Sequence, residues 1–415
     1  MLRKYTIIIL SAVLALLPVK LSAQAVADSV MTISGMVRDE NRRLAFVNVS
    51  IRESTLGTVT NEDGYFSLKI PKTDGDITLF ISHIGYSTYE KTMKASDAHE
   101  LRIILQPYSN LLDAALVVEH DPEHLVYEAL QRVRYNYSAK PISQRAFYRE
   151  TARKGNRYIS VSEAVMDLYK TGYHRSIEAD RVGVLKGRRL MSQRSADTLA
   201  VKMQGGPNTS LSLDVVKNRS DLFYEEDLPN YEYKMEPPSV IEGRPVYVVS
   251  MKPYIRNDRY PLYNALVYID KESLAIMRAE YSVDMSQPDL VSNAILMKKP
   301  NGVKFDAIGV SFVSSYRLVG GMAVLQYVRG TIEFKCDWKK RLFSSPYTIV
   351  TEMVATDIKT HDVEQIGFKD SFRSFEIFYD KVDAFADPLF WENYNVLEPS
   401  ESLEHAVDRL RRRLN

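Results

Sequence analysis

The chain has 415 residues, of which 45% are hydrophobic and 26% charged. This balance is typical of globular proteins and excludes a wholly disordered or collagen-like chain, and the length suggests about two or three domains. With 54 basic and 53 acidic residues the net charge is +1, so we expect no nucleic-acid partner that needs a broad basic surface. The single cysteine, Cys336, excludes an intramolecular disulfide framework and a cysteine-based zinc or iron–sulfur site.

The N-terminus has the three-part layout of a secretory signal peptide, predicted over residues 1–23. Arg3 gives a positive start, residues 5–17 are apolar, and small residues stand at Ala23 and Ala25. The apolar run is shorter than the ~20 residues that span a bilayer, although an uncleaved anchor helix is the alternative. Because the region of the cut contains no cysteine, we expect no lipoprotein anchor. The layout predicts export to the periplasm, with the protein periplasmic or associated with the outer membrane.

Residues 30–107 are predicted to form a small antiparallel β-sandwich. Apolar residues alternate with polar ones at Val47, Val49 and Ile51, which indicates a strand with one buried face. Polar turn sequences at 39–42, 61–64 and 74–76 separate such short runs.

Four segments of this region, 35–37, 45–49, 57–66 and 82–86, resemble the carboxypeptidase regulatory-like domain. The resemblance implies a transthyretin-like sandwich without peptidase chemistry, common at the N-termini of exported Bacteroidetes proteins. In the turn, Gly64 can take a positive φ. Glu62 and Asp63 offer calcium binding as an alternative, but calcium needs about six oxygens and the spacing matches no complete loop.

Residues 108–140 are predicted to be a linker with a helix that Asp121 caps and Pro122 opens. Its apolar stripe is Leu125, Ala129, Val133 and Tyr137, and it ends near Asn136.

His120 and His124 lie four residues apart, a spacing that suits a metal pair on a helix. Pro122 places His120 outside the helix, so solvated polar residues are the favoured interpretation. Segments 127–137 and 147–150, the second reading Phe-Tyr-Arg-Glu, are similar to the corresponding part of the DUF5686-type proteins of Bacteroidetes.

Residues 141–398 are predicted to form a larger curved antiparallel β domain, half-barrel-like in shape, so that the fold class is mainly β. Segments 265–270 and 275–281 form a hairpin around a polar turn at 271–273. Between 183 and 233 the pattern is irregular, with a break at 205–208 and a short helix at 210–216.

The pattern at 243–250, 268–270 and 276–280 resembles the periplasmic lipoprotein-carrier and sigma-factor-regulator superfamily. That resemblance implies a curved sheet whose concave apolar face holds acyl chains. The 26 tyrosines suit strands, or alternatively a face that binds sugar or lipid.

A C-terminal helix is predicted over 399–415, after the aromatic residues Phe385, Phe390 and Trp391. Its apolar stripe is Leu403, Val407, Leu410 and Leu414, and the arginines at 409 and 411–413 suit the negative end of the helix dipole. Contact with anionic lipid is the alternative explanation of these arginines.

No catalytic, cofactor-binding or metal-binding residues are assigned. The seven histidines are scattered, and Cys336 lies in a strand-like run that indicates a buried thiol. We expect an exported, non-enzymatic envelope protein that binds a lipid or acyl group, a lipoprotein, or an outer-membrane or secreted protein at the periplasmic face of the outer membrane. The alternative is a glycan-binding or protein-docking scaffold module of a secreted or surface system.

Overall fold

The computed structural model describes residues 30–108, 120–192, 206–295, 303–338, 344–384, 391 and 394–412. The predicted signal peptide, part of the linker, Phe385, Phe390 and Leu414 lie outside these residues. None of the helices in the described ranges is long and apolar enough to cross a membrane.

The N-terminal region is a sandwich of two small sheets, with strand orders β4-β1-β7 and β3-β2-β5-β6. Every second residue of β4 is buried, as the period of a half-buried strand requires. The predicted sandwich is confirmed, except that β1 and β7 pair in parallel rather than antiparallel. Its strands are β1 (Val30–Arg38), β2 (Asn48–Ile51), β3 (Gly57–Val59), β4 (Tyr65–Pro71), β5 (Asp76–Ser82), β6 (Tyr89–Lys94) and β7 (Leu101–Ile104), with a short helix η1 (Ala95–Asp97) between β6 and β7.

The turn at 61–64 is fixed by side-chain hydrogen bonds and by one glycine. The backbone N–H groups of Asp63 and Tyr65 donate to Asn61 Oδ1 over 3.0 and 2.9 Å. Gly64 has φ +78°, and a Cβ there would lie 2.7 Å from the carbonyl oxygen of Val37. Another residue type would therefore meet both backbone strain and a steric clash.

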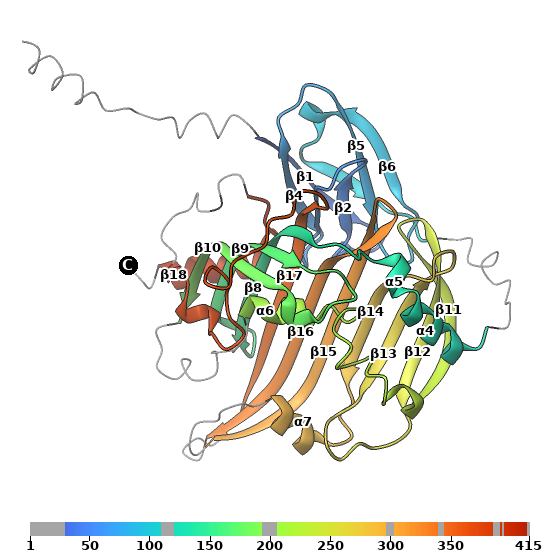
Figure 1. The fold of residues 1–415 in the computed structure, drawn as a ribbon. Helices are drawn as coiled ribbons and strands as arrows, with labels where there is room; N and C mark the ends of the chain where they lie inside the picture. The colour runs from blue at the N-terminus through green and yellow to red at the C-terminus, as the bar shows by residue number, and fades with distance from the viewer. Residues whose placement is uncertain are drawn as a thin grey trace, which may run out of the picture.

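The rest of the chain builds an 11-stranded sheet with the order β11-β12-β13-β14-β15-β16-β17-β8-β9-β10-β18 (Figure 1). Neighbouring strands are antiparallel except β10 and β18, which are parallel. The predicted large, mainly antiparallel β domain is confirmed, and because the two end strands do not pair, its sheet is not closed. The strands are β8 (Ile142–Lys154), β9 (Arg157–Lys170), β10 (Arg181–Met191), β11 (Tyr231–Ile241), β12 (Arg244–Pro253), β13 (Tyr263–Asp270), β14 (Ile276–Val283), β15 (Val303–Val319), β16 (Met322–Trp338), β17 (Ser345–Lys359) and β18 (Asp383–Ala384).

The helices are short, and all of those described except the C-terminal α8 lie between strands in the sequence. Asp121 Oδ1 accepts a hydrogen bond from the Glu123 N–H and Pro122 opens the first helix, so the predicted cap is confirmed. The buried stripe ends at Val133 and Tyr137, also as predicted. The helices are α4 (Pro122–Gln131), α5 (Val133–Asn136), η2 (Ile177–Ala179), α6 (Gly206–Ser212), η3 (Leu228–Asn230), α7 (Pro288–Ile295), η4 (Phe378–Asp380) and α8 (Glu401–Arg411).

Between residues 183 and 233 the sequence prediction was wrong in two respects. The region contains most of β10 and the start of β11, which carry many charged residues because they lie at or near the edges of the sheet. Helix α6 begins at Gly206, so residues 206–208 of the expected break lie inside it. Pro207 occupies its first turn, where a missing N–H costs no hydrogen bond.

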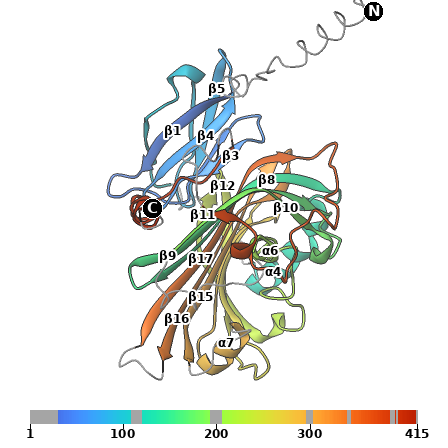
Figure 2. The ribbon, with the colours of Figure 1, turned by 90° about the vertical axis from the view of Figure 1, so that its left-hand side faces the viewer.

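Different elements cover the two faces of the large sheet (Figure 2). Helices α4 and α6 lie within its curve, on what we call the inner face, whereas the sandwich and α8 lie on the opposite, outer face. Because side chains alternate along each strand, every strand contributes to both faces.

On the outer face, a row of alternating charges crosses β16, β17, β8, β9 and β10. The strand register places the five side chains opposite one another in pairs. Arg149 Nε lies 2.8 Å from Glu163 Oε1, and the other ion pairs of the row are 2.7–3.4 Å long. We call this row the Arg–Glu ladder; its members are Arg329, Glu352, Arg149, Glu163 and Arg188.

The sandwich covers the ladder and completes its charge balance. Glu62 accepts from Arg329 over 2.7 Å, which gives the ladder a third carboxylate for its third arginine. Beside it, Val59 of β3 packs against Phe147, Tyr327 and Val354 of the sheet. The central members of the ladder are therefore shielded from water: the side chains of Arg149, Glu163 and Glu352 are 4%, 6% and 10% exposed.

The C-terminal segment, described at 391 and 394–412, ties the sandwich to the sheet. Arg149 Nη2 donates to the Leu397 carbonyl over 2.6 Å. On the sandwich side, the N–H of Glu401 donates to Asp63 Oδ2 over 2.7 Å, so the 61–64 turn helps to cap α8. The Asn395 side chain bonds both backbone groups of Lys69, as a neighbouring strand would. Glu62 and Asp63 thus have structural partners.

Arg149→Met is expected to lower the free energy of unfolding by about 3–5 kcal/mol, because it removes the central, most buried cation of the ladder and leaves Glu163 and Glu352 with one arginine each, Arg188 and Arg329. The matched variant is Arg145→Met on the same strand, whose ion pair with Asp167 is part-exposed and worth about 0–1 kcal/mol. Urea unfolding followed by tryptophan fluorescence measures both. If both variants lost the same free energy of unfolding, the ladder would stabilise the fold no more than an ordinary part-exposed ion pair does.

Candidate functional site

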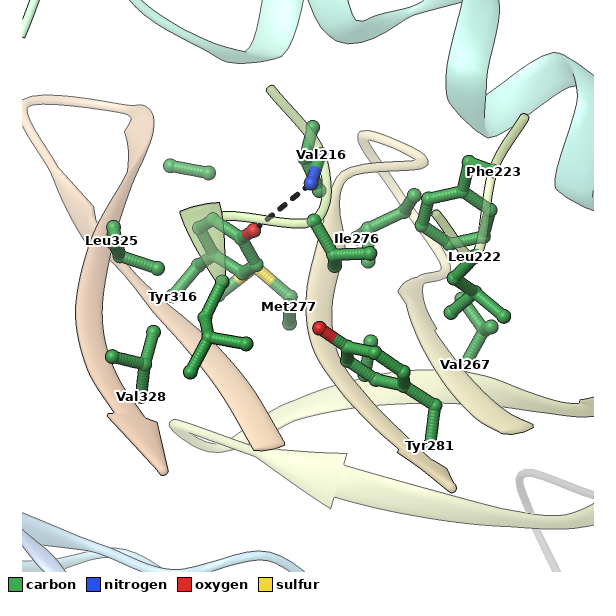
Figure 3. Packing of buried hydrophobic residues seen from close by; sticks show 14 of the residues in the cluster. Val216, Leu222, Phe223, Val267, Ile276, Met277, Tyr281, Tyr316, Leu325 and Val328 are labelled. Atoms are coloured by element: carbon green, nitrogen blue, oxygen red, sulfur yellow. Dashed lines mark hydrogen bonds between the residues drawn. The ribbon is translucent and has the colours of Figure 1, made fainter. Parts of the chain in front are cut away.

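The inner face of the large sheet is apolar, and the chain's own short segments cover part of it. Figure 3 shows Val216, Leu222 and Phe223 of the covering segment 213–230 against sheet residues that include Val267, Tyr281 and Val328. The Val216 N–H donates to the Tyr316 hydroxyl over 3.2 Å. Here the curved face forms a packed core, not an open cleft.

A buried polar cluster fixes the covering segment at this end. Asp214 accepts hydrogen bonds from Lys170 Nζ (2.7 Å), the Tyr173 hydroxyl (2.8 Å) and the Tyr316 hydroxyl (2.7 Å). Burial opposes the charge on Lys170, but Asp214 and Asp180 outweigh it and raise the pKa of this lysine. The ion pairs are buried, so opening this cover would cost several kcal/mol.

Farther along the long strands, the inner face carries a second apolar cluster, which we call the distal cluster. Its buried members all come from strands of the sheet: Ala152, Ile159, Phe334, Cys336, Tyr347 and Ile349, with Phe305 and Ile332 packed against them. The ring centroids of Phe305 and Phe334 are 4.7 Å apart, and those of Phe334 and Tyr347 are 5.4 Å apart. The rings form an apolar row across three strands.

Glu150 lies on the inner face beside the distal cluster. The strand register places Thr351 and Ser162 on its two sides. The Tyr148 hydroxyl donates to Glu150 Oε2 over 3.0 Å, whereas the fully buried hydroxyl of Ser162 has no hydrogen-bond partner. Burial raises the pKa of Glu150 to about 7, and the bond from Tyr148 only partly opposes this rise. Glu150 therefore adds a second buried polar site to the inner face, apart from the Asp214 cluster.

The residues that the sequence singled out lie elsewhere or serve the fold. His120 precedes α4, as predicted, and its ring lies edge-on to Tyr247 at 5.1 Å. Cys336 is buried, also as predicted, and burial raises the pKa of its thiol to about 11. Within the described ranges, no group of three or more His, Cys, Asp and Glu residues could hold a metal ion.

Sequence reasoning assigned no role to Glu150, although it lies in the segment that resembles the DUF5686-type proteins. The available signal was alternation: Arg149 and Glu150 are neighbours in a strand and must point to opposite faces. Arg149 belongs to the ladder on the outer face, which places Glu150 on the inner face.

Comparisons with known proteins agree with the sandwich. Residues 33–118 match the model of the CarboxypepD_reg-like domain, so the resemblance read from the sequence is confirmed. A search of curated proteins found no match.

Solved structures similar to the chain include members of the superfamily that the pattern at 243–280 resembles. An outer-membrane lipoprotein-sorting protein domain from Vibrio parahaemolyticus is 11% identical with a TM-score of 0.29, covering 59% of this chain and 94% of its own. A LolA superfamily protein from Nitrosomonas europaea is 9% identical with a TM-score of 0.24, covering 60% and 98%. MucB in complex with MucA is 12% identical with a TM-score of 0.18, covering 58% and 98%. Because TM-scores below 0.5 carry no functional argument, function has to be inferred from the geometry of this chain.

Glu150→Gln is expected to remove a pH-dependent loss of stability. The carboxyl ionises near 4.5 in the unfolded chain and near 7 in the folded chain. Between these values the folded chain keeps a proton that the unfolded chain has lost, so stability falls as the pH rises through this window and then levels off. The fall amounts to about 3 kcal/mol.

Urea unfolding of both proteins at pH 5 and pH 8 measures this difference. The variant should be the more stable protein at pH 8. Comparing the two proteins also cancels the contribution of His83. Burial lowers the pKa of His83 to about 4, so its contribution makes stability rise with pH rather than fall. If the free energy of unfolding changed by the same amount between pH 5 and pH 8 in both proteins, the raised pKa of Glu150 would be contradicted.

Proposed function

We propose that this protein is an exported, non-enzymatic protein of the cell envelope that binds an acyl-bearing amphiphile on the inner face of its curved sheet. The observation that carries the proposal is the distal cluster: a buried, aromatic-rich apolar cluster on the inner face of an unclosed sheet, built wholly from strand residues among those described. Curved antiparallel sheets are a common way of enclosing an apolar ligand.

The cover of the inner face supports a binding role. A second sheet would close this face permanently, whereas here short helices and loops cover it in separate pieces. The Asp214 cluster holds one piece firmly, so we place the ligand at the distal cluster rather than under residues 213–217. The regulatory-like sandwich contacts the Arg–Glu ladder on the outer face, so its role here is to stabilise the curved sheet.

The place of action follows from the N-terminal sequence. A signal peptide would deliver the protein to the periplasm, where the periplasmic face of the outer membrane supplies acyl-bearing lipids and lipoproteins. The buried Cys336 thiol fits an oxidising compartment, since it is shielded from other thiols.

Docking of another envelope protein is the second candidate, favoured by an exposed aromatic pair. The side chains of Phe368 and Phe375 are 63% and 61% exposed, and the Arg373 guanidinium lies 4.8 Å and 5.8 Å from their ring centroids. Exposed aromatic residues beside an arginine are typical of interaction hot spots. The glycan alternative has less support, because many of the tyrosines are core residues.

Native mass spectrometry of the full chain, purified gently from the envelope, tests the proposal. We expect a bound mass that extracts into organic solvent. Ile349→Asp should abolish this bound mass because it places a charge in the distal cluster. Thr348→Asp, at the preceding residue on the outer face, should retain it. A ligand-free mass together with no uptake of a fluorescent fatty-acid probe would contradict lipid binding and favour protein docking.

A further inference from the structure

We propose that the carboxyl group of Glu150 binds the polar end of the amphiphile, and that this polar end is a cation or hydrogen-bond donor such as a primary amine. The inference rests on the proposed function and adds to it the chemical class of the ligand. It starts from one feature: Glu150 is buried on the inner face and, among the described residues, forms no ion pair.

The position of Glu150 suits the head of an amphiphile whose tail lies on the distal cluster. Ala152, a member of that cluster, is two residues farther along β8, which corresponds to ~7 Å of strand. Beyond Ala152, the Phe305, Phe334 and Tyr347 rings continue the apolar row, and Lys154 Nζ lies 5.6 Å from the centroid of the Tyr347 ring. Glu150 therefore stands at one end of an apolar track, where an amphiphile needs its polar contact.

The surroundings of Glu150 contain unused hydrogen-bonding capacity. Ser162, directly opposite on β9, is fully buried and its hydroxyl has no partner. A buried polar atom without a partner costs free energy. A ligand amine has several N–H groups and can donate to the carboxylate and to this hydroxyl together.

The charges around this point favour a cation over an anion. Tyr148 is the titratable group that contacts Glu150, while β17 presents Thr351 and η4 places Phe378 against the Tyr148 ring. Arg189 lies opposite Ser162, two strands from Glu150 and ~10 Å away by strand spacing, and it is not among the groups that shift the pKa of Glu150. A fatty-acid carboxylate would face a second carboxyl group here, whereas an ammonium group would pair with it.

Binding of an amine has a measurable proton balance. The pKa of Glu150 is about 7, so the carboxyl is mostly protonated at pH 6. An ammonium ligand favours the ionised form, and the proton that the carboxyl loses passes to the buffer. Binding should therefore release up to one proton at pH 6 and fewer at pH 8.

Isothermal titration of the full chain with dodecylamine and with dodecanoic acid, both below their micellar concentrations, tests the proposal. The wild type should bind dodecylamine roughly tenfold or more tightly than dodecanoic acid, as expected when one charged contact is gained or lost. Its binding heat at pH 6 should change with the ionisation enthalpy of the buffer. Glu150→Gln should lose the preference for the amine and the proton release.

Glu333→Gln is the matched control, because Glu333 is an exposed glutamate on β16 next to Phe334 of the distal cluster. This variant should behave as the wild type, and thermal melting confirms that both variants are folded. Amphiphile binding that Glu150→Gln leaves unchanged would overturn the role of Glu150 and leave the proposed function standing. If neither probe binds, the proposed function fails as well.

Discussion

The Arg–Glu ladder is the constraint on which the rest of the architecture depends. Charged side chains that are removed from water must be paired, or the folded state loses several kcal/mol. Here the pairing partners come from five strands, and Glu62 of the sandwich supplies the last carboxylate. The central residues of the ladder stay shielded from water only if the sandwich and the C-terminal segment remain on the outer face. That requirement holds both of them in place.

Because the sandwich and the C-terminal segment cover the outer face, the inner face is left for binding. The two faces differ in how their polar groups are satisfied: on the outer face carboxylates alternate with guanidinium groups, and at the Asp214 cluster each carboxylate meets a lysine. Glu150 departs from this pattern, because burial raises its pKa and Tyr148 supplies its hydrogen bond. Such an uncompensated group lowers stability and is typical of a functional site.

Sequence patterns predicted the elements with strong local signals. The alternation of Val47, Val49 and Ile51, the Asp121–Pro122 helix start and the hairpin β13–β14 all depend on residues close in the chain, and all are present. Strands β10 and β11 were missed because strands at or next to the edge of a sheet carry charges that hide the period of two. The ladder could not be predicted, since Arg149 and Glu352 are 203 residues apart and meet only through the register of β8 and β17. The same register decides that Glu150 faces inward.

Photo-crosslinking tests the central claim, that the inner face of the sheet holds an amphiphile, most directly. The full chain would be irradiated with a long-chain amine that carries a diazirine in its tail, and the labelled peptides would be identified by mass spectrometry. The account predicts labels on inner-face positions of β8, β9, β16 and β17 around the distal cluster, and competition by unlabelled dodecylamine. Labels confined to the outer face or to the exposed Phe368 and Phe375 loop would contradict it.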